Sequence, residues 1–176
     1  MTTKPVSYTT AAASGTAVGA FSRLQQIMIG HGILILFMSL VAGVGLWVSL
    51  LGGFELIPGH LIAFQIPGTP EGWAKAHRGT PMNALMIIAV ALVLPHLGFT
   101  ARSQRWLAVV IVGAGWGNTI FYYFSNFSAN RGLSFGDNAF GHGGILSVIA
   151  LAPAYAFGIA SMIATLYMAW KILFRR

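Results

Sequence analysis

Five histidines are the side chains of this chain best suited to metal binding or acid–base catalysis. Imidazole titrates near neutral pH and is a common ligand of metals and of haem iron. His77 is followed six residues later by Asn83 in AKAHRGTPMNAL, and Asn118 is followed four residues later by Tyr122 in GNTIFY. Residues four apart share one face of a helix. These four residues are therefore the first candidates for a site.

Other kinds of chemistry are excluded by residues that the sequence lacks. No Asp or Glu lies within the long stretches 24–54, 79–101, 106–130 and 138–170. A carboxylate nucleophile, a pair of catalytic carboxylates and a carboxylate proton relay inside these stretches are therefore excluded. The absence of cysteine excludes a thiolate nucleophile, a cysteine zinc site and a thiolate-ligated haem.

The elements that position the candidates are membrane helices. Of the 176 residues, 56% are hydrophobic and 7% are charged, whereas soluble domains carry about 25% charged residues. Each long stretch holds the roughly 20 apolar residues that cross a bilayer. The sequence predicts an all-α integral membrane protein: a flexible tail over 1–22, then one four-helix transmembrane bundle over 23–174. Its helices are expected at about 26–51, 70–99, 106–127 and 145–174.

The basic residues set the orientation of this bundle. Ten Lys and Arg are too few for a nucleic-acid surface, but their distribution is uneven. Three lie on one side, namely Lys75, Arg78 and Arg131; seven lie on the side of the termini and second loop, namely Lys4, Arg23, Arg102, Arg105, Lys171, Arg175 and Arg176. Because cytoplasmic loops carry the excess of positive charge, both termini are predicted to be cytoplasmic.

This topology places several candidates at similar depth. His77 lies near the outer edge, and Asn83 lies about 9 Å beyond it on a continuous helix. Tyr122 lies about 13 Å below the outer edge, so it shares the outer leaflet with Asn83, and Asn118 lies deeper. Polar groups in lipid are costly without partners, and several together indicate a polar-lined pocket. The alternative is that the amides and phenols only join helices.

The remaining histidines are assigned by position. His60 lies in the outer loop and His96 follows Pro95 at the inner end of the second helix, which favours interfacial hydrogen bonding for both. His31 lies in the inner leaflet, and His142 lies near the outer edge.

Two further patterns bear on the helices. Thr69-Pro70-Glu71 is typical of a helix start, and Pro81 either kinks or restarts the second helix. Small residues recur four apart at Ser39 and Gly43, at Gly113 and Gly117, and along Ala156, Ala160 and Ala164. Such rows allow close helix packing, although small residues are also simply common in membrane helices.

Long strings of the chain closely resemble styrene oxide isomerases. They include GHGILILF, PGTPEGWAKAHRGTPMNALMIIAVALVLPHLGF and GWGNTIFYYFSNFSANRGLSFGDNAFG, and the likeness runs from about Gly30 to Gly158. The resemblance implies a four-helix enzyme of the bacterial inner membrane that forms homotrimers and holds haem b. It implies conversion of aryl epoxides, such as styrene oxide, to aldehydes, such as phenylacetaldehyde, without net redox change.

The resemblance also implies roles for individual residues. His77 would be the axial ligand of a ferric haem that acts as a Lewis acid, near a subunit interface. Asn83 and Tyr122 would hold the substrate oxygen. Asn118 is assigned to the substrate pocket only because of its position in the matched strings. Trp73, Lys75 and Arg78 are assigned to the haem site on the same ground. The two basic residues would pair with haem propionates, or serve only as anchors at the membrane surface. The chain departs from the family pattern at Ala114, where an acid is expected.

Two other functions fit the same residues. A non-catalytic b-type cytochrome, which carries electrons, needs a second axial histidine, for which His142 and His60 are the nearest candidates. A haem-free scaffold or small-solute transporter would explain the lack of charges within the helices.

Overall fold

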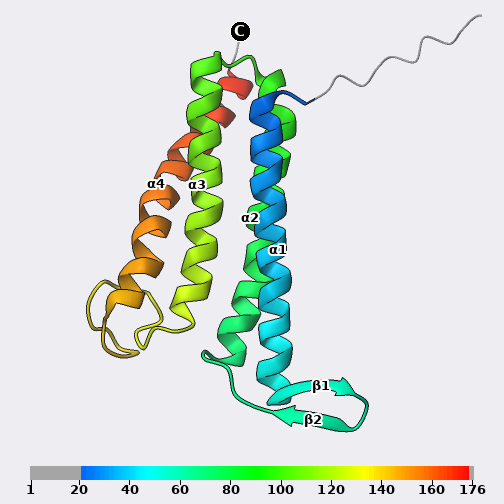
Figure 1. The fold of residues 1–176 in the computed structure, drawn as a ribbon. Coiled ribbons are helices and arrows are strands. Elements are labelled where there is room, and N and C mark those ends of the chain that lie inside the picture. The colour runs from blue at the N-terminus through cyan, green and yellow to red at the C-terminus, as the bar shows by residue number, and fades with distance from the viewer. Residues whose placement is uncertain (1–20, 175–176) are drawn as a thin grey trace, which may run out of the picture.

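The computed structural model describes residues 21–174, which form four long helices and a short hairpin. The helices are α1 (Arg23–Leu51), α2 (Pro70–Val93), α3 (Ala101–Ser125) and α4 (Ile145–Leu173), and the 3-10 helix η1 (Leu94–Leu97) extends α2. Each of the four is long and apolar enough to cross a membrane. The helices run up and down, and α1 begins at the end of the bundle where α4 finishes (Figure 1). The predicted all-helical chain with four spanning helices is confirmed, whereas cytoplasmic termini and a trimer remain predictions.

Side-chain caps decide where the helices begin. Ser22 caps α1 and Thr100 caps α3, each by accepting a backbone N–H three residues later. The cap at Thr100 starts α3 at residue 101, ahead of the expected 106. Thr69 caps α2 as expected, with Pro70 in the first turn. The helix continues through Pro81 to Val93, so it does not restart at the proline. The predicted tail at 1–22 lies outside the described residues, except for residues 21 and 22.

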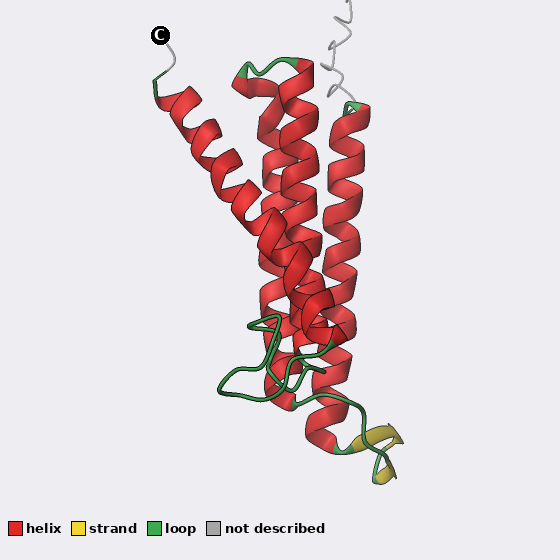
Figure 2. Ribbon diagram, turned by 90° about the vertical axis from the view of Figure 1, so that its left-hand side faces the viewer, coloured by secondary structure: helices red, strands yellow, loops and turns green. Residues whose placement is uncertain are grey.

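The segment between α1 and α2, expected to be a loop, contains a β-hairpin. Strands β1 (Gly53–Ile57) and β2 (His60–Ala63) pair antiparallel, with Gly53 opposite Ala63. Gly52, at φ 72°, turns the chain out of α1, a conformation that glycine adopts at little cost. The hairpin projects from the end of the bundle remote from the termini (Figure 2).

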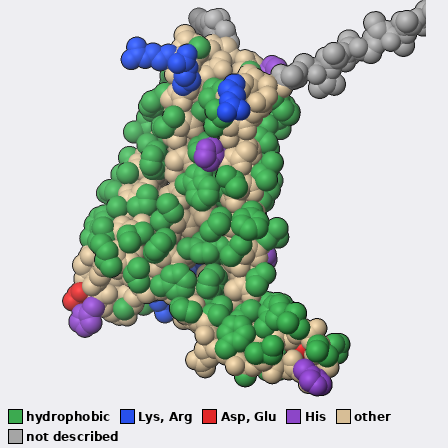
Figure 3. Space-filling model, in the orientation of Figure 1, with side chains coloured by type: hydrophobic (Ala, Val, Ile, Leu, Met, Phe, Trp, Pro, Cys, Tyr) green, Lys and Arg blue, Asp and Glu red, His purple; other side chains and the backbone are tan. Residues whose placement is uncertain are grey.

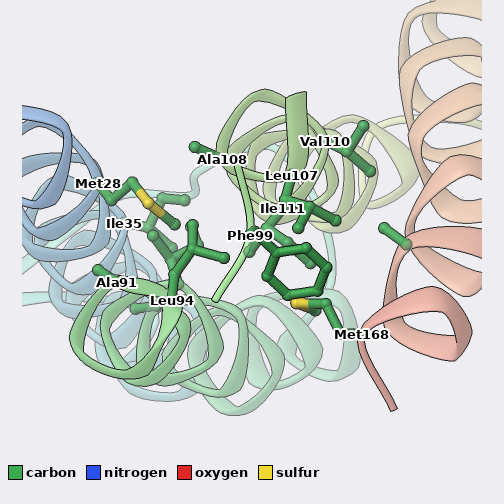
Figure 4. Close-up of a cluster of buried hydrophobic side chains, with 13 residues drawn as sticks. Met28, Ile35, Ala91, Leu94, Phe99, Leu107, Ala108, Val110, Ile111 and Met168 are labelled. Atoms are coloured by element: carbon green, nitrogen blue, oxygen red, sulfur yellow. The ribbon is translucent and has the colours of Figure 1, made fainter. Parts of the chain in front are cut away.

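The hydrophobic core joins the beginnings of α1 and α3 to the ends of α2 and α4, and Figure 4 shows its side chains. Met28 and Ile35 of α1, Ile87 of α2 and Leu107 and Ile111 of α3 are completely or almost completely buried there. Because lipid is as apolar as these side chains, their close packing rather than their removal from water stabilises the contact. The visible outer surface of the bundle is also largely hydrophobic, with basic side chains near the end that holds the termini (Figure 3).

Small residues bring α3 and α4 together, as their spacing predicted. A Cβ atom on Gly117 would lie 2.9 Å from the carbonyl oxygen of Pro153, and one on Gly113 would lie 2.2 Å from the ring of Phe157. Ala164 of α4 is fully buried in the core. Beyond this contact α4 leans away from the other helices (Figure 2).

The outer loop between α3 and α4 is organised by Asn130, whose side chain is fully buried. Its Oδ1 accepts hydrogen bonds from the hydroxyls of Ser128 and Ser147 and from the N–H of Gly132, at 2.8, 2.6 and 3.0 Å. Its Nδ2 donates to the carbonyl of Gly136 at 2.8 Å. The distinctive string SANRGLSFG therefore has a structural explanation, because one amide holds the loop to the first turn of α4.

Candidate active site

His77 extends from α2 toward α1, where its half-buried ring lies against a small-residue surface. Its Nδ1 atom lies 3.0 Å from the carbonyl oxygen of Ser39. A Cβ atom on Gly43 would lie 2.9 Å from the same Nδ1, so glycine leaves the space that the ring occupies. A carbonyl only accepts hydrogen bonds, so Nδ1 carries the proton. Within residues 21–174 the Nε2 atom makes no hydrogen bond, which leaves its lone pair available to a metal.

An open groove of about 620 Å³ runs beside His77 between α1 and the first turns of α2. It brings together three of the predicted haem-site residues, His77, Lys75 and Arg78. Its remaining lining comes from Leu46 and Leu50 of α1 and from Pro70, Glu71 and Ala74 of α2. The groove therefore combines apolar walls, two cations, the Glu71 carboxylate and one imidazole.

A second group of predicted residues meets between α2 and α3. Asn118 Nδ2 donates to Asn83 Oδ1 at 3.3 Å. One helical turn away, the ring of Tyr122 lies against Gly79, where a Cβ atom would come within 2.5 Å of it. Because α2 and α3 are antiparallel, the Asn83–Asn118 contact and the Gly79–Tyr122 contact lie next to each other along the two helices. Asn83 and Tyr122 are therefore about one turn apart.

Two hydrogen-bond donors of this second group have no partner within the described chain. Asn83 is 8% exposed, yet its Nδ2 makes no hydrogen bond. The hydroxyl of Tyr122 also makes none among residues 21–174. A buried donor without an acceptor, as at Asn83, costs about 1–3 kcal/mol, so a ligand oxygen would relieve that cost. Ala114 continues the same face of α3 one turn beyond Asn118 and is buried, and it supplies no acid.

The two groups lie on different faces of α2. Six residues separate His77 from Asn83, which is a rotation of about 600°, or 240° around the helix. His77 accordingly faces Ser39 of α1, whereas Asn83 faces Asn118 of α3. Polar groups at similar depth do meet, as Asn83 and Asn118 show. Similar depth does not, however, place the His77 imidazole and the Asn83 amide on the same face of α2 within one chain.

Trp73 joins three helices instead of lining the groove. A Cβ atom on Gly45 would lie 2.6 Å from its ring, and the indole packs edge-on against Tyr123 and Phe127 at 5.9 and 5.7 Å. Its Nε1 donates to the Pro67 carbonyl at 3.1 Å. In this structure Trp73 therefore supports the start of α2.

The other histidines have separate surroundings. His31 accepts a hydrogen bond from the indole of Trp116 at 3.1 Å. His60 is exposed on β2, and His96 is exposed on η1. His142 lies 3.0 Å from Asp137 in the outer loop, with both side chains largely exposed. Within residues 21–174, no ring contact or hydrogen bond joins His77 to another histidine.

The Asp137–His142 contact predicts a pH effect at the outer surface. The hydrogen bond from His142, and then the N–H of Gly143, hold the pKa of Asp137 below its usual range. The pairing thus stabilises the loop above the ordinary carboxyl pKa, and this stabilisation is lost as pH falls through the lowered pKa. Asp137 is the single aspartate of the chain, so ¹³C-aspartate labelling gives one NMR titration curve. We expect its midpoint to rise in His142→Ala; an unchanged midpoint would contradict the assigned cause.

Two positions on α1, Ser39 and Gly43, contact His77 although sequence reasoning gave them no part in the site. Their four-residue spacing indicated a close helix contact but did not identify the residue that fills it. Sequence reasoning also gave Pro81 no part in the site, although its position four residues after His77 was the available signal.

Comparison with known proteins adds to this geometry. The family model described as styrene oxide isomerase matches residues 24–173. A protein from Pseudomonas fluorescens named styrene-oxide isomerase is 54% identical over 149 residues, which covers 85% of this chain and 88% of that protein. The residues matched by the family model include the two groups described above. The chain therefore belongs to the styrene oxide isomerase family and is an isomerase.

Proposed function

We propose that the chain converts aryl epoxides such as styrene oxide to arylacetaldehydes such as phenylacetaldehyde. Family membership and the name of the Pseudomonas relative support this reaction. The observation that carries it within the molecule is the buried Asn83 Nδ2, which has no hydrogen-bond partner among the described residues. It lies about one turn from the Tyr122 hydroxyl, which also makes no hydrogen bond there. An epoxide oxygen is an uncharged acceptor that can take both hydrogen bonds.

The chemistry is an internal rearrangement, so no atom enters or leaves. The bond from oxygen to the benzylic carbon opens, because the aryl ring delocalises the positive charge that develops there. A hydride then moves from the neighbouring carbon to the benzylic carbon, and that neighbouring carbon becomes the aldehyde. Throughout, Asn83 and Tyr122 hold the oxygen and stabilise its growing negative charge, as donors of an oxyanion hole do. Asn118 orients the Asn83 amide by occupying its Oδ1.

The surroundings keep water from the reaction. A benzylic cation that met water would become a diol, so exclusion of water favours the aldehyde. Beyond Glu71, in the first turn of α2, the four helices contain no carboxylate that could attack the epoxide. A membrane interior also suits a substrate that partitions into lipid.

The cofactor of the proposal is ferric haem b, whose iron His77 would bind. The residues fit such a group: Ser39 holds the Nδ1 proton and leaves Nε2 free, and the groove offers Leu46 and Leu50 as apolar walls. Lys75 and Arg78 carry the charge that pairs with propionates. When bound, a ferric haem with one protein ligand supplies a Lewis acid for the epoxide oxygen.

The division of the site between two faces of α2 supports an oligomer. The groove at His77 and the donors at Asn83 and Tyr122 face different neighbours within one chain. We therefore place the haem near a subunit interface of a homotrimer. The trimer would lie in the bacterial inner membrane, surrounded by lipid, with cytoplasmic termini.

The visible spectrum of the purified protein tests this proposal. We expect a haem b spectrum in the oxidised protein that changes when styrene oxide is added, and no such change after reduction with dithionite. Ferrous iron is the poorer Lewis acid, so it should not respond to the epoxide. A low-spin spectrum that styrene oxide leaves unchanged would favour the electron carrier, and colourless protein that still isomerises the substrate would remove haem from the mechanism.

A further inference from the structure

The carbonyl group of His77 lacks its usual partner within α2. In an α-helix this oxygen accepts the N–H of the residue four positions later. That residue is Pro81, which has no N–H. α2 nevertheless runs through this position without interruption. The backbone beside the proposed haem ligand therefore needs a donor from elsewhere, because an unpaired carbonyl in a membrane interior is costly.

Ser39 of α1 supplies that donor. Its hydroxyl donates to the His77 carbonyl at 2.9 Å, across the contact between α1 and α2. A serine within a helix commonly bonds back to its own preceding turn, but this side chain, 3% exposed, crosses to the neighbouring helix instead. The carbonyl of the same Ser39 accepts the His77 Nδ1 proton at 3.0 Å. One residue of α1 thus holds both the backbone and the side chain of His77.

Gly43 completes the arrangement one turn further along α1. A Cβ atom there would lie 2.9 Å from His77 Nδ1 and 3.0 Å from Cε1. These distances are too short for the imidazole to stay where it is. Glycine at position 43 therefore sets how closely the ring approaches α1, and with it the direction of Nε2.

We propose that Ser39, Gly43 and Pro81 are positioning residues that act as one unit on His77, an inference that rests on His77 being the haem ligand. Pro81 withholds the intrahelical donor, so the His77 carbonyl bonds to Ser39. That bond places Ser39 where its own carbonyl takes the Nδ1 proton. The ring is thereby held with its Nδ1–H on the Ser39 carbonyl and Nε2 directed away from Ser39, and a hydrogen-bonded Nδ1–H makes Nε2 a stronger ligand.

The experiment compares Ser39→Ala, Pro81→Ala and the double variant in the purified full-length protein. The readout is the rate at which bound haem transfers to excess apomyoglobin. We expect transfer from Ser39→Ala to be roughly 10- to 100-fold faster, as when groups that support a metal ligand are removed. In the double variant, the alanine that replaces Pro81 donates its backbone N–H to the His77 carbonyl. The rate should therefore return to within about twofold of Pro81→Ala alone.

A matched control is Ser161→Ala in α4. Ser161 donates to the backbone carbonyl of Gly158 at 2.8 Å, so this variant also removes a serine-to-carbonyl bond within a membrane helix. It should leave the transfer rate within about twofold of the unmodified protein. An equal acceleration in Ser161→Ala would overturn the proposal, because it would identify a general loss of stability.

Gly43→Ala supplies a spectroscopic readout that a purely structural role would not move. The added methyl group should turn the imidazole, and the electron paramagnetic resonance spectrum of the haem that remains bound should change. The proposal is overturned if Ser39→Ala and Gly43→Ala both match the unmodified protein in transfer rate and spectrum. If, in the same series, His77→Ala loses haem, the assignment of His77 as haem ligand is kept and only the positioning role of Ser39, Gly43 and Pro81 is rejected. If His77→Ala keeps haem, the ligand assignment and this inference fail together.

Discussion

His77→Ala is expected to purify as a folded but largely colourless protein. The substitution removes the imidazole whose Nδ1 is bonded to Ser39 and whose Nε2 is free to bind iron. A metal Lewis acid supplies several kcal/mol of transition-state stabilisation, so its loss should lower turnover by at least about 10³-fold. Haem content per protein and the rate of phenylacetaldehyde formation from styrene oxide measure the two effects. Full haem occupancy in this variant would assign the ligand to another residue.

Two other histidine variants make this result specific. His60 is exposed on the hairpin, and His142 is paired with Asp137 at the outer surface. Neither lies in the groove beside His77. His60→Ala and His142→Ala should therefore keep both haem and turnover. Loss of haem in either variant would point to a second axial histidine, and so to the electron carrier rather than the isomerase mechanism.

Tyr122→Phe is expected to keep its haem and to turn over slowly. The substitution removes only the hydroxyl, which has no partner among residues 21–174, and leaves the ring against Gly79. Loss of one donor that stabilises developing negative charge on oxygen costs about 2.7–4 kcal/mol, or roughly 10²- to 10³-fold in turnover. Steady-state rates with styrene oxide measure the loss, and the visible spectrum confirms that haem is still bound.

The next residue provides the matched control. The hydroxyl of Tyr123 donates to the Met38 carbonyl of α1 and so joins α3 to α1. Tyr123→Phe should lower the free energy of unfolding by about 1 kcal/mol, the usual net value of such a bond. Its turnover should stay close to that of the unmodified protein. Similar turnover losses in both variants would show that the Tyr122 hydroxyl has no special role.

Much of the fold could be predicted because it depends on local properties of the sequence. Four stretches long enough to span a bilayer predicted the four helices. The helix start at Thr69-Pro70-Glu71 was confirmed, because capping involves residues only three positions apart. The β-hairpin was missed although Pro58-Gly59, a typical turn dipeptide, lies between its strands, because the flanking residues do not alternate between apolar and polar. The start of α3 was predicted too late because the spanning stretch was counted from the residue after Arg105, whereas Thr100 caps a helix that includes Arg102 and Arg105.

The candidate site was predictable in its residue types and depth but not in its arrangement. Asn83 and Asn118 were expected to line a pocket or only to join helices; they are hydrogen bonded between α2 and α3, which agrees with the second, and the pocket stays a prediction. His77 was expected in the same pocket, yet it faces α1. Depth follows from counting residues along a helix of known rise, whereas the face that meets a given neighbour depends on how the helices are rotated about their axes.

The sequence by itself determined that the chain has four helices long and apolar enough to span a membrane, which side-chain chemistry is absent from them, and which family it resembles. Only the tertiary structure decided that Ser39 and Gly43 contact His77, and that Asn83 and Tyr122 have donors without partners in the described part of the chain. The physical reason is the solvent. In water, apolar residues mark the buried face of a helix, but in lipid the outer face is equally apolar, so the pattern does not reveal which faces meet. Those contacts are set by the close fit of small and large side chains between helices.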